Sequence, residues 1–246
     1  MRYFTHLFQI IKVGYLFTRC ETPDNFLPKN NKSLLNKLLN YNKKKKKTFS
    51  STLESLGPAY IKLGQFLATR PDIIGEELSK KLENLQDKLP PFSLNQAKEI
   101  IKNDLGEETF NSIIDLSEPV AAASIAQVHK AKIDNNGTIK DVAIKILRPN
   151  IKKIFNEEID AMMLFAFLVE SFVKKTKRLK LVEVVFLLKE ITNLEMDLRF
   201  EAAAANEYSE NTKNDFGFRV PQIFWNFTSE NVMTLDWFNE NGGNLS

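Results

Sequence analysis

Lys145, the last residue of the stretch Val142–Lys145, is the side chain whose setting most restricts the chemistry of this chain. Because side chains alternate along a strand, we expect Val142 and Ile144 to point to one side and Ala143 and Lys145 to point to the other. An ammonium group on the inward side of a strand needs an anionic partner, since burying it without one is expensive. The alternative is an ordinary surface lysine.

Three acidic residues that could interact with a cation follow at Glu195, Asp197 and Glu201. We expect them on one helix, where Asp197 and Glu201, at spacing i,i+4, share a face and repel each other. A nearby cation would relieve this repulsion, and Lys145 and Mg²⁺ are the two candidates. The alternative is an acidic helix face in contact with solvent.

Small residues fill the stretch Pro119–His129, where Ala121, Ala122 and Ala123 precede Ser124 and no glycine occurs. Val142–Lys145 matches the sequence around the lysine that binds nucleotide phosphates in protein kinases. A kinase places the loop that covers those phosphates between the first two strands of its sheet, where Pro119–His129 is expected to lie. A packed turn of small residues is the alternative.

Lys62 and Gln65, three residues apart, face the same way on a further predicted helix. Gly64 lies between them, although glycine costs about 1 kcal/mol relative to alanine inside a helix. We therefore expect Gly64 to permit the close approach of another segment.

Length and composition exclude several classes of protein. The 246 residues suffice for one large domain or two small ones, but not for a two-lobed enzyme with long additions. With 43% hydrophobic and 26% charged residues, the chain is expected to fold. A single cysteine, Cys20, excludes a disulfide scaffold, and two histidines, His6 and His129, leave too few ligands for zinc and argue against a Ser-His-Asp triad.

The basic residues gather at the N-terminus. The first 62 residues carry 12 basic and three acidic side chains, whereas the other 184 carry 22 and 28. Residues 3–19 predict an amphipathic helix, and Lys43–Lys47 cannot pack in a core. This segment is either a docked helix with a solvated linker or an arm on an anionic membrane. Nucleic acid is not expected as a partner, because no aromatic residues alternate with the lysines.

The sequence pattern predicts an α+β fold for the elements that position these residues. Residues 48–115 are helical in pattern, with breaks at prolines and helices over 72–89 and 93–105, the second running from a Ser93 cap to Gly106. Asn136 and Gly137 predict a hairpin turn. Two helices, over 151–174 and 181–211, separate three strands from two in a five-stranded antiparallel sheet with helices on one face. The expected strands cover 113–120, 125–133, 141–147, 219–225 and 231–237.

In this order the motifs resemble the UbiB family of atypical kinase-like proteins, which is linked to ubiquinone biosynthesis. The resemblance runs from about residue 50 to residue 240, and the KxGQ sequence at Lys62–Gln65 is its most specific part. The matching stretches are Leu56–Gln65, Thr69–Asp72, Leu85–Asp87, Ala121–His129, Val142–Lys145 and Glu195–Ala202.

The resemblance implies a kinase-like small lobe behind a helical extension, with the large lobe absent from this chain. The implied parts are a basic membrane-proximal arm (1–47), the KxGQ extension (48–109), the small lobe with a helical insertion (110–238) and a truncated hinge (239–246).

The resemblance also implies roles for individual residues. Lys145 would bind the α- and β-phosphates of ATP or ADP and pair with Glu201, both as catalytic residues. Ala121–Ser124 would cover the nucleotide, and Lys62 and Gln65 would fold over the site, where Lys62 meets Glu195 and Asp197. The ligands of the accompanying Mg²⁺ would lie mostly in the missing lobe, so no metal ligand is assigned here.

The implied function is that of the ATP-binding half of a UbiB-type kinase or ATPase, peripheral on the cytoplasmic face of a bacterial inner membrane. Its partners would be nucleotide, an anionic membrane surface, and ubiquinone-pathway enzymes or lipids. Asp215–Gly217 spells the DFG of kinases, but no histidine follows His129 to form the catalytic loop, so we expect little or no turnover. The alternative is a non-catalytic membrane-associated scaffold or regulator of ubiquinone-pathway enzymes.

Overall fold

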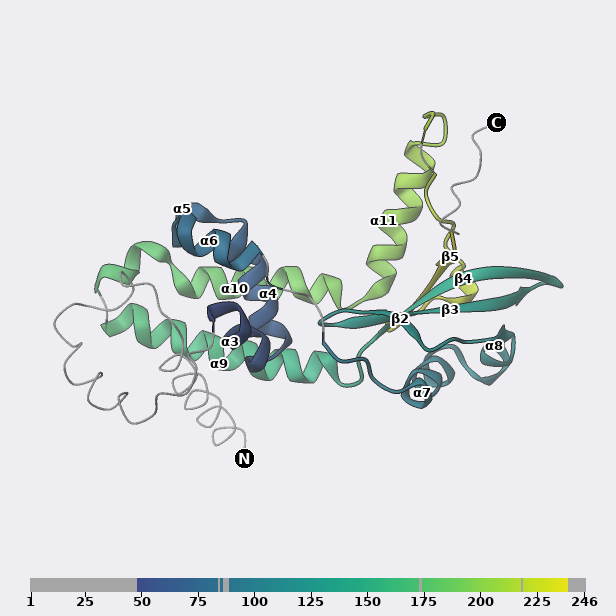
Figure 1. The fold of residues 1–246 in the computed structure, drawn as a ribbon, viewed down its shortest axis with the longest axis horizontal. Helices are drawn as coiled ribbons and strands as arrows, with labels where there is room; N and C mark the ends of the chain where they lie inside the picture. The colour runs from purple at the N-terminus through teal and green to yellow at the C-terminus, as the bar shows by residue number, and fades with distance from the viewer. Residues whose placement is uncertain (1–47, 84, 86–88, 173, 218, 239–246) are drawn as a thin grey trace. The chain divides into compact units, whose positions relative to one another are not determined.

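The computed structural model describes residues 48–83, 85, 89–172, 174–217 and 219–238. The predicted arm 1–47 and hinge 239–246 lie outside the described residues. Contacts divide the chain into two compact units, which we call the helical unit (Met1–Asp87 and Lys153–Glu190) and the sheet unit (Lys88–Lys152 and Ile191–Ser246). Figure 1 draws the helices of the helical unit and the sheet of the sheet unit.

Prolines and glycines set the ends of the first helices of the helical unit. Pro58 and Pro71 each take the first position of a helix, where the missing N–H costs nothing. The predicted helix over 72–89 is wrong in extent, because Gly75 has a φ of 83° and divides it in two, and the second part ends at Glu83. These helices are α3 (Phe49–Leu56), α4 (Pro58–Ala68), α5 (Pro71–Ile74) and α6 (Glu76–Glu83).

A long helical hairpin supplies the rest of the helical unit. It consists of α9 (Ile151–Phe172), the 3₁₀ helix η2 (Lys174–Leu179) and α10 (Leu181–Glu195), whose outer ends belong to the sheet unit. One face of α9 is buried through Phe155, Ile159 and Met162. Among the described residues, none of the helices combines the length and the hydrophobicity of a transmembrane span.

The sheet unit confirms the five-stranded antiparallel sheet. The strands are β1 (Ile113–Ile114), β2 (Pro119–Ala122), β3 (Ala126–Asn135), β4 (Thr138–Leu147) and β5 (Val232–Asp236). Their order is β1-β3-β4-β5, and β2 also pairs with β3. The predicted hairpin joins β3 to β4, because Asn136 and Gly137 adopt the positive φ values, 56° and 81°, that its turn requires.

Two strand predictions differ from the structure. The predicted strand over 219–225 is wrong, since in the described residues this stretch makes a single bridge, from Ile223 to Leu235, before the 3₁₀ helix η3 (Trp225–Phe227). Pro221 lacks the N–H that a ladder would need there. The predicted strand over 113–120 is divided into β1 and β2, and Asp115, with a φ of 54°, lies in the break.

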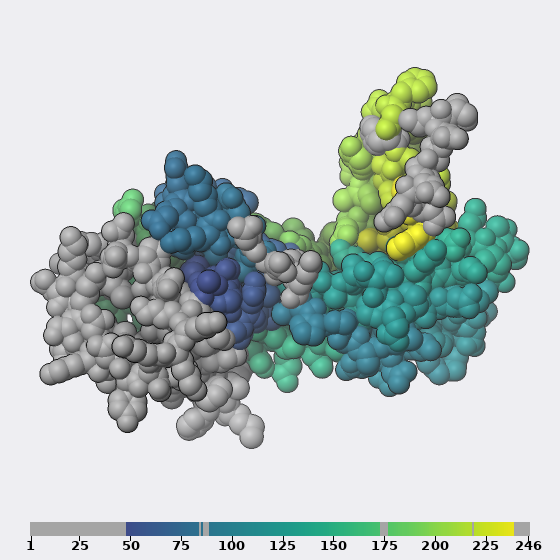
Figure 2. All heavy atoms as spheres, in the orientation of Figure 1, coloured from purple at the N-terminus to yellow at the C-terminus, as the bar shows by residue number. Residues whose placement is uncertain are grey.

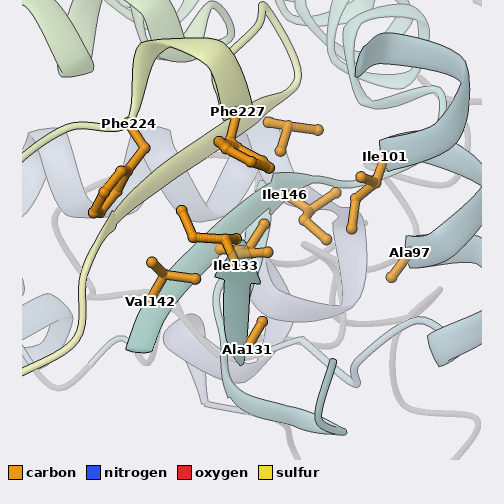
Figure 3. Packing of buried hydrophobic residues seen from close by; sticks show 10 residues of the cluster. Ala97, Ile101, Ala131, Ile133, Val142, Ile146, Phe224 and Phe227 are labelled. Atoms are coloured by element: carbon orange, nitrogen blue, oxygen red, sulfur yellow. The ribbon is translucent and has the colours of Figure 1, made fainter. Parts of the chain in front are cut away.

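One face of the sheet is covered by α7 (Leu94–Leu105), which α8 (Glu107–Asn111) follows. The predicted caps of α7 are confirmed, with a capping box between Ser93 and Gln96 and Gly106 at the other end. Ile101 of α7 lies beside Ile146 of β4 in the core (Figure 3). The buried cluster comprises Ala97, Ile101, Ala131, Ile133, Val142, Ile144, Ile146, Phe224, Phe227 and Val232.

The other face of the sheet carries α11 (Leu198–Asn211), which contacts β5. Figure 2 shows α11 at the surface of the sheet unit. The expectation of helices on one face is therefore wrong. The single helix predicted over 181–211 is also wrong, because Asp197 takes an extended conformation (φ −130°, ψ 99°) and caps a new helix.

Candidate functional site

The side chain of Lys145 projects from the sheet face opposite the buried cluster. Along β4, Val142, Ile144 and Ile146 are buried, whereas Ala143 and Lys145 are only partly so, as the predicted alternation requires. The Lys145 ammonium donates to both carboxylate oxygens of Glu201, at 2.7 and 2.6 Å. The two side chains are 25% and 47% exposed. The structure thus gives Lys145 the anionic partner that the sequence requires, in a place that solvent can reach.

The strand register brings the alanine stretch into line with Lys145. Ala121 of β2 lies opposite Val128 of β3, and Val128 lies opposite Lys145 of β4. Residues directly opposite in adjacent antiparallel strands share a face, and two strand spacings amount to about 10 Å. Ala121 and Lys145 therefore lie on the same face of the sheet, with one strand between them.

The turn at the end of β2 needs no glycine. Ala123 N–H donates to the Ala126 carbonyl at 2.8 Å, which closes the turn. Among the described residues, the non-glycine positions with positive φ are elsewhere, at Asp115, Asn136, Asn150 and Lys180. Ala121 is exposed and Ser124 is fully buried. The alanines can thus replace glycines because this turn uses ordinary backbone conformations.

Arg148, which the sequence analysis missed, connects this turn to residues 89–92. Its guanidinium donates to the carbonyls of Ala123 (3.0 and 2.7 Å), Pro90 (2.9 Å) and Leu89 (3.1 Å). Gln127 holds the same segment, since its side chain accepts from Phe92 N–H at 3.0 Å and donates to the Phe92 carbonyl at 3.1 Å. The only sequence feature that could have indicated Arg148 is its place three residues after Lys145.

His129 is a structural residue of β3. Its Nε2 accepts from the Gln127 amide at 2.8 Å, so its Nδ1–H donates to the Ser117 carbonyl at 2.7 Å. Burial lowers the pKa of His129, although the Ser117 carbonyl and Glu118 oppose this shift. Within the described residues, no group of three or more His, Cys, Asp and Glu side chains could hold a metal ion.

Asp197 and Glu201 do not repel each other in the predicted way. Asp197 is the N-cap of α11 and accepts from Arg199 N–H at 3.1 Å, while the Arg199 guanidinium donates to its oxygens at 2.9 and 2.7 Å. Hydrogen bonding to Arg199 holds the pKa of Asp197 below its usual range. Glu201 lies in the first turn, where the helix dipole favours negative charge. Glu195 is the last residue of α10.

Lys62 and Gln65 belong to α4 of the helical unit, and two glycines fit this helix against its neighbours. A Cβ on Gly64 would lie 2.5 Å from Leu85 Cδ2 and 2.8 Å from Leu53 Cδ1, so the expected close approach is confirmed. A Cβ on Gly57 would collide with the carboxylate of Glu158. The implied contact of Lys62 with Glu195 and Asp197 joins residues of different units and stays a prediction.

Glu158 of α9, also missed from the sequence, caps α4. Its carboxylate is buried and accepts from Ala59 N–H, at the start of α4, at 2.8 Å. Burial and the Glu158 charge both raise the pKa of Tyr60, the next residue of the helix. An acidic residue among the apolar positions of the predicted helix over 151–174 is a pattern that could have indicated a partner for Glu158.

Asp215–Gly217 lies beyond the end of α11. Phe216 is fully exposed, and Gly217 has a φ of 104°. The tripeptide therefore packs against no core of the sheet unit. We interpret its resemblance to the DFG sequence of kinases as a coincidence.

Comparison with known proteins shows which family the chain is similar to. Residues 84–242 match a family model described as the ABC1 atypical kinase-like domain. Proteins named "Probable protein kinase UbiB" are similar to the chain: that of Marinobacter nauticus is 37% identical over 185 residues and that of Vibrio cholerae 40% identical over 186. These matches cover 75% of the chain but only 33% and 34% of the relatives, so the chain spans about a third of their length. The resemblance drawn from the motifs is confirmed.

Proposed function

The chain belongs to the ABC1 atypical kinase-like family, and we propose that its sheet unit binds the phosphates of ATP or ADP through Lys145. The observation that carries this proposal is that the Lys145 ammonium donates hydrogen bonds to both carboxylate oxygens of Glu201. Lys145 also lies on the same face of the sheet as Ala121. An ammonium held in this way by a partly exposed carboxylate is a fixed point charge that suits phosphate oxygens. Ala121–Ser124 would cover the bound phosphates.

Magnesium fits the described acidic residues less well. Asp197 is ion-paired with Arg199, and Glu201 is ion-paired with Lys145. We therefore assign the nucleotide phosphates to Lys145 and assign no metal ligand in the described part of the chain. A magnesium ion bound together with the nucleotide would supply positive charge to offset the charge that develops during phosphoryl transfer.

We propose that the nucleotide site serves a UbiB-type kinase or ATPase reaction that supports ubiquinone biosynthesis. The support is the family and the name of its relatives in Marinobacter nauticus and Vibrio cholerae. We also propose that the 246-residue chain alone turns over ATP slowly or not at all, because its sequence contains no kinase catalytic loop. Hydrolysis of radiolabelled ATP that Lys145→Ala abolishes would contradict this second proposal.

Nucleotide binding is tested by equilibrium dialysis of the 246-residue chain with radiolabelled ADP. The Lys145→Ala variant is compared with Lys140→Ala, which removes an exposed lysine from the same strand. We expect the Lys145 variant to lose at least tenfold in affinity and the Lys140 variant to match the wild type. Equal affinities of the two variants would contradict the proposed site.

A membrane-associated scaffold is the second candidate function, and the outer face of α9 favours it. Besides Ile154 near its start, five large apolar residues of this helix are exposed, from 38% for Leu168 to 81% for Phe172. They are Leu164, Phe165, Phe167, Leu168 and Phe172. Five basic residues follow within 174–180. Exposed aromatic residues beside basic ones suit the interface of an anionic bilayer, where the arm 1–47 would add further charge.

The membrane proposal places the protein peripherally on the cytoplasmic face of a bacterial inner membrane. Its test is sedimentation of the chain with vesicles of phosphatidylglycerol and phosphatidylcholine, without nucleotide. We expect Phe172→Ser, and replacement of Lys43–Lys47 by glutamine, to lower the bound fraction. Phe216→Ser, which changes a fully exposed phenylalanine of the sheet unit, is the control. Unchanged sedimentation of both test variants would contradict the proposal.

A further inference from the structure

Arg148 is the residue that joins the alanine turn to the segment 89–92. We propose that it is a positioning residue, which holds Ala121–Ser124 in place over the nucleotide phosphates and ties this turn to residues 89–92. The inference rests on the proposed nucleotide site. It adds to that site a residue that touches neither Lys145 nor Glu201 in any of the hydrogen bonds described above.

The segment 89–92 depends on side chains for its attachment to the sheet. Pro90 and Pro91 have no N–H, so this stretch cannot donate a ladder of backbone hydrogen bonds. Its carbonyls at Leu89 and Pro90 accept from Arg148, and both backbone groups of Phe92 pair with Gln127. Arg148 and Gln127 therefore substitute for a strand pairing that the prolines prevent.

The same guanidinium determines where the alanine turn lies. Two of its nitrogens donate to the Ala123 carbonyl, at 3.0 and 2.7 Å. The backbone N–H of Arg148 also donates to the Ile125 carbonyl, at 2.9 Å, within the turn that the Ala123–Ala126 hydrogen bond closes. Because Arg148 follows Lys145 by three residues at the end of β4, its contacts fix the turn relative to the strand that carries the phosphate-binding lysine.

Lysine could not replace Arg148 in this position. The contacts need several N–H groups in a fixed fork, and an ammonium is a single point charge on a flexible stem. The guanidinium also lies 5.9 Å from the centre of the Phe92 ring, a contact that arginine makes more readily than lysine. Arg148→Lys thus keeps the positive charge but removes the planar arrangement of N–H donors.

The test compares the Arg148→Lys variant of the 246-residue chain with the wild type. Arg178→Lys, which changes an exposed arginine of the helical unit in the same way, is the control. Amide hydrogen exchange is followed in residues 121–126 and at Phe92 without nucleotide. Dissociation constants for ADP and AMP are measured by competition with a fluorescent ADP analogue. We expect faster exchange at both places in Arg148→Lys and an ADP dissociation constant raised about tenfold, or about 1.4 kcal/mol.

The comparison of ADP with AMP separates positioning from a general loss of structure. Displacement of the turn that covers the phosphates should weaken the binding of ADP, which has two phosphates, more than the binding of AMP, which has one. We therefore expect the dissociation constant of AMP to rise less than that of ADP. Equal weakening of both ligands, an unchanged ADP constant, or unchanged exchange in residues 121–126 would each overturn the inference. If the wild type binds no ADP, the proposed function fails, and the exchange data alone decide whether Arg148 holds the turn.

Discussion

The Lys145 ammonium and the Glu201 carboxylate are joined by two hydrogen bonds, of 2.7 and 2.6 Å, between the end of β4 and the first turn of α11. Both side chains keep some exposure, 25% and 47%, so solvent screens their attraction and the pair adds little to stability. The main effect of the pair is that the Glu201 carboxylate fixes the direction of the flexible Lys145 side chain. This relationship leads to the first prediction.

Glu201→Gln should separate orientation from stability. The amide keeps the shape of the side chain but loses the charge, so we expect the free energy of unfolding to change by less than about 1 kcal/mol. ADP affinity should fall severalfold, because Lys145 is no longer fixed. Calorimetric titration of the variant checks this, with Glu207→Gln, an exposed residue of the same helix, as the control. A clear loss of stability with unchanged ADP affinity would mean that the pair is merely structural.

Gly64→Ala should destabilise the helical unit. Alanine normally favours a helix by about 1 kcal/mol relative to glycine, but here its Cβ meets the buried side chains of Leu53 and Leu85. We expect a net loss of about 1–3 kcal/mol in the free energy of unfolding, measured with urea. The double variant Gly64→Ala/Leu85→Ala should lose less free energy of unfolding than the sum of the two single variants, because removing the Leu85 side chain makes room for the new Cβ. Strictly additive losses would argue against the close approach.

Local patterns predicted much of the fold. The caps at Ser93 and Gly106 and the turn at Asn136 and Gly137 are determined by residues near in sequence, and all were predictable. The break at Asp197 was missed, because the apolar spacing continues across it and only the cap residue indicates it. The strand predicted over 219–225 does not form, and the reason is also local, because Pro221 lacks the N–H that strand pairing needs.

The site was only partly predictable. Lys145, Glu201 and the alanine stretch could be named because their types and order are distinctive. Arg148 and Glu158 were missed, because the sequence offers only weak signals for them and they act on backbone groups 25 to 99 residues away. No local periodicity encodes contacts at such separations, and burial of the carboxylate of Glu158 follows only once α9 packs near α4.

Glu158→Ala should weaken the start of α4. The change leaves the Ala59 N–H without its carboxylate acceptor, which costs about 1–3 kcal/mol for a buried donor. Glu158→Gln should cost less, because an amide oxygen can still accept. Glu157→Ala, a change in the neighbouring and less buried glutamate, is the matched control in urea unfolding. Equal losses for Glu157→Ala and Glu158→Ala would contradict the capping contact.

His129 should make the protein less stable in mild acid. Burial depresses its folded-state pKa below the ordinary value of 6.5, so the unfolded chain binds the proton more readily. This contribution to stability is complete above about pH 6.5 and is lost as pH falls toward the depressed folded-state value. We expect the free energy of unfolding to decline from about pH 7 to about pH 5, and less steeply in His129→Gln. An equal slope in the variant would assign the decline to other groups.

Protection of Lys145 by nucleotide tests the central claim most directly. The 246-residue chain is pulsed with an amine-acetylating reagent, with and without saturating ADP, and acetylation of Lys145 and Lys140 is measured by mass spectrometry. Phosphates bound at the ammonium should shield Lys145 and leave the exposed Lys140 unaffected. We predict at least fivefold slower acetylation of Lys145 with ADP and no change at Lys140. Equal acetylation of Lys145 with and without ADP would contradict the account.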